Sequence, residues 1–228
     1  YDTGIISGAI FFIKSHFALD VFMTEAVVAA VLLGAAFGSI SSAKLANVLG
    51  RKKIIEVNAL VFMTSTLISA FANNILFLIL GRLGVGFAIG IACYIAPLYI
   101  SELAPARYRG GLVALNTIAV TGGIFISYLI GFFLSPIESW RWMLGLGVIP
   151  AMILWIGVRY LPESPRWLVK QGHMQKAQLV LAKIRGSKEA AETEILLIQS
   201  SLKEKKPSWR ELLRPGIRKV VVIGIVLA

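Results

Sequence analysis

Residues 75–100 read ILFLILGRLGVGFAIGIACYIAPLYI, an apolar segment that contains a single charged side chain, Arg82. A helix of about 20 apolar residues is long enough to cross the hydrocarbon core of a membrane. A charge inside such a helix is costly, so it usually serves an ion, a polar solute or a partner charge. A second apolar segment, YDTGIISGAIFFI at residues 1–13, contains Asp2. The two segments predict an all-α membrane protein with an acid and a base inside its spans.

The composition of the whole chain agrees with a membrane protein. Of its 228 residues, 57% are hydrophobic and 15% are charged, and the mean hydropathy is +0.78. Soluble domains are less apolar than this. The apolar segments predict a first span cut short at the start of the chain, five complete spans and the beginning of a seventh. These spans are expected at residues 1–15, 26–48, 54–72, 75–99, 111–134, 142–160 and 220–228.

Basic residues are concentrated in alternate loops. The chain carries a net charge of +11, and its Lys and Arg residues gather after the second span, after the fourth span and between Arg159 and Lys219. Because Lys and Arg favour cytoplasmic loops, these loops and the N-terminus are predicted to be cytoplasmic in a multi-pass protein of the cell membrane. Nucleic-acid binding is the weaker explanation of the charge, because aromatic residues do not alternate with the basic ones. The expected partner is therefore the lipid bilayer and not a nucleic acid.

The six spans fall into two groups of three, residues 1–72 and 75–160, which meet at a turn formed by Asn73 and Asn74. In each group the connection between the second and third spans is basic, which is typical of inverted repeats in transporters, although membrane topology alone would also produce two basic loops. The expected fold is a six-helix bundle of two three-helix inverted repeats, followed by short intracellular helices. The expected parts are the bundle at 1–160, a cytoplasmic linker at 161–217 and the start of the seventh span at 218–228.

The linker is expected to contain short helices. Ser164 and Pro165 favour a helix start, and Gly186 favours the end of that helix. A second helix is expected to begin near Ser187, with acidic residues early and basic residues late, as the helix dipole favours. A linker without helices is the alternative, because long loops between domains are often disordered.

Asp2 and Arg82 lie at depths that permit contact. Asp2 is twelve residues before Lys14 and Arg82 is eight residues after Asn74, which places them roughly 18 Å and 12 Å below the outer surface at 1.5 Å per residue. If Arg82 pairs with Asp2, it keeps the carboxylate ionised, and separation of the two favours proton uptake by Asp2. This is the chemistry of a proton-coupled carrier. A static ion pair that fixes helix packing is the alternative.

Neutral polar side chains interrupt the fifth span. Amides and hydroxyls donate and accept hydrogen bonds without a charge, which suits a hydroxylated, uncharged ligand. Thr and Ser in spans also bond to their own backbone or to a neighbouring helix, and this is the preferred explanation for Thr121 and Ser127. The candidate substrate-binding residues are Asn116, Thr117 and Thr121.

Charged residues are predicted at the cytoplasmic ends of several helices. Acid–base clusters at helix ends can form and break contacts as helices move, and so act as a gate. Each of these charges alone would be an ordinary interfacial charge in water. The candidate gate residues are Arg51, Glu102, Arg109, Glu163 and Arg166.

The sequence indicates a carrier and not an enzyme. It has no His pair, no cluster with metal-ligand spacing and no nucleophile with an adjacent base. Its single cysteine, Cys93, lies inside a predicted span and is expected to be a small packing residue. We therefore expect neither a cofactor nor a metal.

Several motifs together resemble one family. They are YDTGIISGA at 1–9, GRLGVGFAIG at 81–90, APLYISELAPARYRGG at 96–111, WRWMLG at 140–145 and PESPRWL at 162–168. In combination they look like the sugar porter family of the major facilitator superfamily, over essentially the whole chain. The resemblance implies a twelve-span carrier that works by alternating access, with a monosaccharide bound between two six-helix halves. The chain would be the N-terminal half, and its partner would be the C-terminal half of the same protein.

The resemblance also implies roles for individual residues. Asp2 and Arg82 match the acid and the Arg of proton-coupled members, whereas facilitators lack the acid, so the implied function is proton symport of a hexose or pentose. Glu102, Glu163 and the candidate gate arginines match the inner charge network of the family. An uncoupled facilitator is the closest alternative, and a sugar sensor that does not transport is a further one.

The chain departs from the family pattern at two places. The loop after the second span commonly reads Asp-Arg-x-Gly-Arg, and here Asn47 and Val48 replace its first two residues. One contact of the gate is therefore expected to be weaker or differently built. Many members have Asn-Gln on the fifth span where this chain has Asn116 and Thr117, so the sugar is not fixed by the resemblance.

Overall fold

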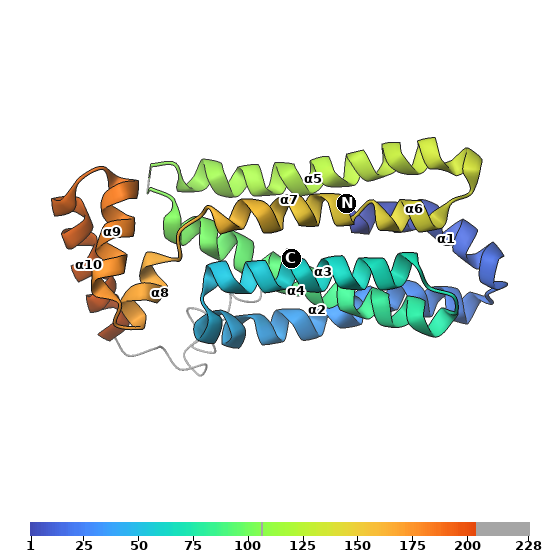
Figure 1. The fold of residues 1–228 in the computed structure, drawn as a ribbon, viewed down its shortest axis with the longest axis horizontal. Coiled ribbons are helices and arrows are strands. Elements are labelled where there is room, and N and C mark those ends of the chain that lie inside the picture. The colour runs from blue at the N-terminus through green and yellow to red at the C-terminus, as the bar shows by residue number, and fades with distance from the viewer. Residues whose placement is uncertain (106, 204–228) are drawn as a thin grey trace, which may run out of the picture.

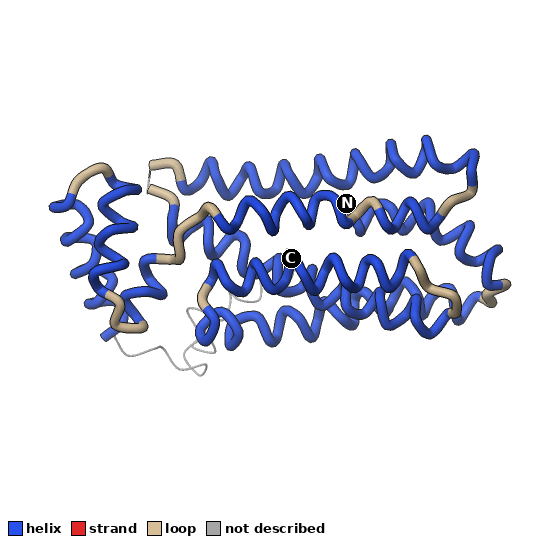
Figure 2. Tube along the Cα trace, viewed as in Figure 1, coloured by secondary structure: helices blue, strands red, loops and turns tan. Residues whose placement is uncertain are grey.

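The computed structural model describes residues 1–105 and 107–203, and all regular elements in these ranges are helical. The helices are α1 (Asp2–Phe17), α2 (Val21–Leu49), α3 (Arg51–Ala70), α4 (Ile75–Leu103), α5 (Arg109–Leu134), the 3-10 helix η1 (Ser135–Ile137), α6 (Trp140–Gly145), α7 (Val148–Arg159), α8 (Pro165–Lys170), α9 (Met174–Arg185) and α10 (Lys188–Lys203). The first seven α-helices lie along one axis, and α8, α9 and α10 gather at one end of the bundle (Figure 1). Short loops connect most of the helices (Figure 2).

The predicted all-α membrane fold is confirmed. Within the described residues, five helical segments are long and apolar enough to cross a membrane. They correspond to the second to sixth predicted spans, and α1 lies at the position of the first. The predicted seventh span at 218–228 and the end of the linker lie outside the described residues.

Polar side chains and a glycine set the helix boundaries. Asp20 accepts a hydrogen bond from the backbone N–H of Met23 at 2.7 Å at the start of α2, and Asn74 accepts one from Phe77 at 3.0 Å at the start of α4. Such caps satisfy backbone donors that the helix itself leaves free. A single residue, Gly50, separates α2 from α3 and has a φ of +91°, a conformation that other residues adopt only with strain.

α2 and α4 make the most extensive contact in the described bundle. Gly34 and Gly38 of α2 face the backbone of α4, and Gly86 and Gly90 of α4 face that of α2. A Cβ added to Gly38 would lie only 2.1 Å from the carbonyl oxygen of Phe87, and a Cβ added to any of the other three glycines would lie equally close to a backbone oxygen. No side chain fits at such distances, so these glycines permit the two helices to touch along their backbones. The sequence alone does not show which helix these glycines contact.

The contacts among the helices agree with an internal repeat. α2 packs on α4 and α1 packs on α5, while α3 contacts α4, and α1 contacts α6. α3 also packs on α7. If the first three spans correspond in order to the last three, the α2–α4 contact is equivalent to the α1–α5 contact, and the α3–α4 contact is equivalent to the α1–α6 contact. The α3–α7 contact is then equivalent to itself. A pseudo-two-fold relation between inverted three-helix repeats produces this pattern.

The sixth span is broken, whereas a continuous helix from Trp142 was expected. α6 begins at Trp140, and a turn at Leu146 and Gly147 separates it from α7. Pro150 has no backbone N–H and therefore cannot donate to the carbonyl of Leu146, which instead accepts from the N–H of Ile149 at 3.1 Å. The proline thus lies in the first turn of α7, where its missing donor costs little.

The linker helices also differ in one respect from those expected. Ser164 caps α8 as predicted, since its side chain accepts a hydrogen bond from the N–H of Trp167, and α9 ends at Gly186 with a φ of +81°. The single helix expected between them is divided, because Gly172 also has a φ of +81° and interrupts it. The second expected helix is α10, which begins at Lys188.

Candidate functional site

Asp2 of α1 and Arg82 of α4 form an ion pair inside the bundle. Arg82 donates a hydrogen bond from Nη1 to Oδ1 of Asp2 at 2.7 Å. Both residues are buried, with 7% of Asp2 and 2% of Arg82 exposed. Gly81 fits tightly against α3, where a Cβ would lie 2.3 Å from the hydroxyl oxygen of Ser69. Because successive helical residues point about 100° apart, Arg82 turns away from that contact and toward α1.

The pair retains hydrogen-bonding capacity that it does not use. Among the residues that the structure describes, Asp2 Oδ2 and Arg82 Nε have no hydrogen-bond partner. A carboxylate with a free oxygen in a buried position can accept a proton once the opposing cation moves away, because a lone buried charge is costly. The geometry is therefore chemically suited to reversible proton binding, and equally to a permanent structural ion pair.

Within the described residues, no hydrogen bond joins the three polar candidates of α5 to this ion pair. Asn116 is half-buried, and Thr117 and Thr121 are exposed. Asn116 is seven residues before Gly123, where a Cβ would lie 3.1 Å from the backbone N of Tyr1. Seven residues are nearly two helical turns, so Asn116 lies on the same face of α5, roughly 10 Å from the level of Asp2.

The hydroxyls of α5 bond within their own helix. Thr121 Oγ1 donates to the carbonyl oxygen of Thr117 at 3.1 Å, and Ser127 Oγ donates to that of Ile124 at 2.6 Å. Ser127 is also in contact with α1, because a Cβ at Gly4 would lie 2.0 Å from its hydroxyl oxygen. A bond to the own backbone or to a neighbouring helix is the explanation preferred from the sequence, and in the structure both hydroxyls bond to their own backbone.

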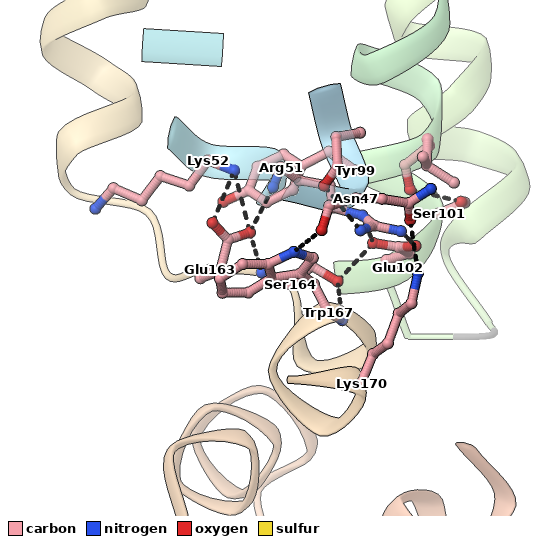
Figure 3. A network of polar contacts seen from close by, with 12 residues as sticks. Asn47, Arg51, Lys52, Tyr99, Ser101, Glu102, Glu163, Ser164, Trp167 and Lys170 are labelled. Carbon is pink, nitrogen blue, oxygen red and sulfur yellow. Dashed lines mark hydrogen bonds and ion pairs between the residues drawn. The ribbon is translucent and has the colours of Figure 1, made fainter. Parts of the chain in front are cut away.

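A second polar cluster lies at the end of the bundle next to α8 (Figure 3). We call its residues Arg51, Glu102, Glu163 and Ser164 the inner network. Arg51 Nη2 donates to Oε1 of Glu102 at 2.9 Å, and its Nε lies 2.8 Å from Oε2 of the same carboxylate without the geometry of a hydrogen bond. Ser164 donates its hydroxyl proton to Oε2 of Glu102 at 2.5 Å. Through Glu102, the inner network therefore joins the start of α3, the last turn of α4 and the start of α8.

Glu163 caps α3 instead of pairing with an arginine side chain. Its Oε1 accepts hydrogen bonds from the backbone N–H groups of Arg51 at 2.9 Å, Lys52 at 3.1 Å and Ser164 at 2.8 Å. A carboxylate is favoured at a helix N-terminus by the free N–H donors and by the dipole. Gly50 makes room for it, since a Cβ there would lie 2.4 Å from Oε2 of Glu163. Glu163 thus needs glycine at position 50 for a steric reason as well as a conformational one.

Asn47, near the end of α2, makes hydrogen bonds to α8. Its backbone carbonyl oxygen accepts from Nε1 of Trp167 at 3.0 Å and from Nε2 of Gln171 at 3.2 Å, and its side-chain Oδ1 accepts from Nζ of Lys170 at 2.9 Å. The departure from the family pattern therefore leaves α2 attached to α8 by neutral and charge-assisted hydrogen bonds. The sequence predicted a contact that is weaker or differently built here, and the hydrogen bonds of Asn47 agree with the second alternative.

Two of the predicted gate residues do not join the inner network. Arg109 and Arg166 are exposed, and neither makes an ion pair within residues 1–105 and 107–203. Sequence reasoning instead missed Arg185 of α9, which donates two hydrogen bonds to Glu194, at 2.6 Å and 2.8 Å, and one to the carbonyl of Leu103 at 3.1 Å. The hydrogen bonds to Glu194 raise the pKa of Arg185 above its usual value. A cation at the last carbonyl of α4 is favoured by the helix dipole. The sequence signal that could have identified Arg185 is its position in the last turn of α9, just before Gly186.

The sequence and the fold of the chain are similar to those of known carriers. The model of the family described as "Sugar (and other) transporter" matches residues 1–228, and the chain belongs to this family. The protein YwtG of Bacillus subtilis is 42% identical over 228 residues, which are 100% of this chain and 50% of YwtG. The D-xylose transporter of Levilactobacillus brevis is 40% identical over 100% of this chain and 50% of its own length. The galactose-proton symporter of Escherichia coli K12 is 39% identical, with 99% and 49% covered.

Solved structures show the same likeness. The xylose transporter XylE from E. coli, in a partially occluded inward-open conformation, has a TM-score of 0.82 with 28% sequence identity, covering 90% of this chain and 54% of XylE. The chain spans about half the length of the curated relatives it matches, and it corresponds to the N-terminal half of XylE. The chain is thus a member of a transporter family of the major facilitator superfamily and a multi-pass membrane protein.

Proposed function

We propose that the protein containing this chain is a proton-coupled monosaccharide symporter. Asp2 carries the proton in this proposal, and Arg82 stabilises its ionised form. The observation that supports it is the buried pair itself, with its 2.7 Å contact and an unpartnered oxygen on Asp2. Relatives named as proton symporters for galactose and arabinose belong to the same family and are 39% identical.

In the proposal the remaining sites serve substrate binding and gating. Asn116, Thr117 and Thr121 line part of the sugar site, where amide and hydroxyl groups match the hydroxyls of a neutral sugar. In the inner network, Arg51, Glu102 and Glu163 hold the intracellular side closed while their contacts are formed, and this side opens when the contacts break. Arg109 and Arg166 join this gate only when the helices move, since both are exposed in the described conformation.

A complete carrier requires a second six-helix half of the same chain. α5 supports this expectation, because Ser127 is its only buried residue, and an apolar helix left open must face lipid or another bundle. The protein is proposed to lie in the cell membrane with the N-terminus and the α8–α10 side in the cytoplasm, as its basic loops favour.

The test uses the full-length protein in liposomes with a pH-sensitive dye, and scans hexoses and pentoses. Proton entry evoked by one sugar is expected, and it would identify the substrate as well as the coupling. Asp2→Asn is expected to abolish uphill accumulation while sugar exchange continues. Asp20→Asn is the matched control, because Asp20 is exposed and caps α2, a role that Asn fulfils equally well.

The outcome that contradicts symport is equally clear. Downhill sugar uptake without proton entry, unchanged in Asp2→Asn, would make the protein a facilitator with a structural Asp2–Arg82 pair. Binding of a sugar without any uptake would favour a sensor.

A further inference from the structure

Tyr1, the residue before Asp2, fastens the start of α1 to the broken sixth span. Its hydroxyl donates a hydrogen bond to the carbonyl oxygen of Met143 in α6 at 2.7 Å. Its ring lies against the turn that separates α6 from α7, because a Cβ added to Gly147 would lie 3.4 Å from two ring carbons of Tyr1. Figure 1 shows the start of the chain beside these two helices. One side chain therefore contacts α6 and the break that follows it.

The break leaves the carbonyl of Met143 free for this hydrogen bond. In an uninterrupted α-helix that oxygen would accept from the backbone N–H of Gly147, four residues later. Gly147 instead donates to the carbonyl oxygen of Leu144 at 3.0 Å. Met143 is fully buried, and a buried carbonyl without a donor is costly. The Tyr1 hydroxyl supplies the donor, so the contact depends on the break and a continuous sixth span would not offer it.

Tyr1 and Asp2 point in different directions from the start of α1. Successive side chains of a helix are about 100° apart, and Tyr1 contacts α6 while Asp2 contacts Arg82 of α4. Rotation of α1 about its axis would therefore disturb both contacts together. Within the described residues, Asp2 Oδ1 is held by Arg82 Nη1 and Oδ2 has no hydrogen-bond partner. The direction of this carboxylate therefore depends on what holds the start of α1.

We propose that Tyr1 is a positioning residue for Asp2. By holding the start of α1 on the Met143 carbonyl, its hydroxyl keeps the Asp2 carboxylate directed at Arg82 and makes their pairing depend on the geometry of the break between α6 and α7. Movement at the break then loosens the ion pair, and this favours proton uptake by Asp2. The inference rests on the proposed proton coupling, and it adds a route by which a change in the sixth span reaches the proton site.

The test compares Tyr1→Phe with the wild type, using the full-length protein in liposomes and the sugar that evokes proton entry. Phenylalanine keeps the ring against Gly147 and removes only the hydroxyl. Uphill accumulation of the sugar is expected to fall about two- to tenfold, the equivalent of one neutral hydrogen bond, because a less firmly paired Asp2 ties fewer transport cycles to a proton. Tyr160→Phe is the matched control, since it removes the hydroxyl of a tyrosine at the other end of α7 that is 85% exposed.

Sugar exchange in the Asp2→Asn background separates positioning from a merely structural role. If Tyr1 acts through Asp2, adding Tyr1→Phe to Asp2→Asn will not slow exchange further. Equal losses of exchange in the wild-type and Asp2→Asn backgrounds would overturn the proposal, and so would unchanged uphill accumulation in Tyr1→Phe. Sugar uptake without proton entry in the wild type would contradict the proposed function and this inference with it. That result is distinguishable, because it is seen without any variant.

Discussion

Glu163 shows how one side chain serves two elements at once. It closes the N-terminus of α3 through the N–H groups of Arg51 and Lys52, and it also accepts from the N–H of Ser164 just before α8. A carboxylate in this position couples the end of a span to the helical unit outside the bundle. Its contribution is therefore to the relative position of two elements as well as to the stability of one helix.

We expect Glu163→Ala to lower the stability of the protein by about 1 kcal/mol, the usual cost of removing a helix cap. The reason is that the first N–H donors of α3 lose their acceptor. Thermal unfolding in detergent would measure it. Arg166→Ala is the control three residues later, because Arg166 is exposed, and it should leave the melting temperature almost unchanged. Equal effects would show that Glu163 does not act as a cap.

Gly50→Ala is expected to destabilise by roughly 1–3 kcal/mol, the range for a residue held in a sparsely populated backbone conformation. Its φ of +91° is strained for alanine, and the new Cβ would lie 2.4 Å from Glu163 Oε2. Combining the change with Glu163→Ala separates the two causes. If the steric clash contributes, Gly50→Ala will cost less in the Glu163→Ala background than alone.

At the scale of whole elements, α2 and α4 act as one unit because four glycines bring their backbones into contact. Gly38→Ala is expected to cost about 1–3 kcal/mol, since overpacking forces the helices apart. The melting temperature of the purified protein would report it. Gly157→Ala in α7 is the matched control, because nothing lies within 4 Å of a Cβ there. That control should be neutral or slightly stabilising, because alanine is the better helix former.

The sequence predicted helices well and their contacts less well, for physical reasons. Apolar length identifies the spans, and Ser164 and Gly186 determine helix ends through local chemistry, so both could be predicted. The partner of Gly86 and Gly90 could not, because periodicity gives the face of a helix and not what lies opposite. The break before α7 needed the effect of Pro150 on the Leu146 carbonyl, which a hydropathy window does not register.

The same limit applies to the candidate sites. Depth along two helices permitted contact between Asp2 and Arg82, but only the three-dimensional arrangement gives the 2.7 Å distance. Residue type predicted charges at the inner helix ends, yet it could not distinguish Glu102, which binds Arg51, from Glu163, which binds backbone N–H groups. Arg109 and Arg166 have the same residue type as Arg51 and lie outside the inner network.

At the scale of the whole molecule, the proposed function makes this chain half of a carrier. Its relatives are about twice as long, and a site between two bundles is incomplete in one of them. We expect the 228-residue chain alone in liposomes to give no sugar uptake above that of empty liposomes. The full-length protein in the same lipid should show uptake. Saturable uptake by the isolated chain would contradict the proposal that substrate binds between the halves.

The backbone contact of α2 and α4 also keeps the distance between these two helices constant. A carrier that alternates its access must change many internal distances, but these two helices cannot slide past each other without their glycines meeting bulkier neighbours. Spin labels placed on the outward faces of α2 and α4 should therefore report one unchanging distance with and without sugar. Labels elsewhere can be triangulated from this pair, which makes it an internal reference frame for every movement of the transport cycle.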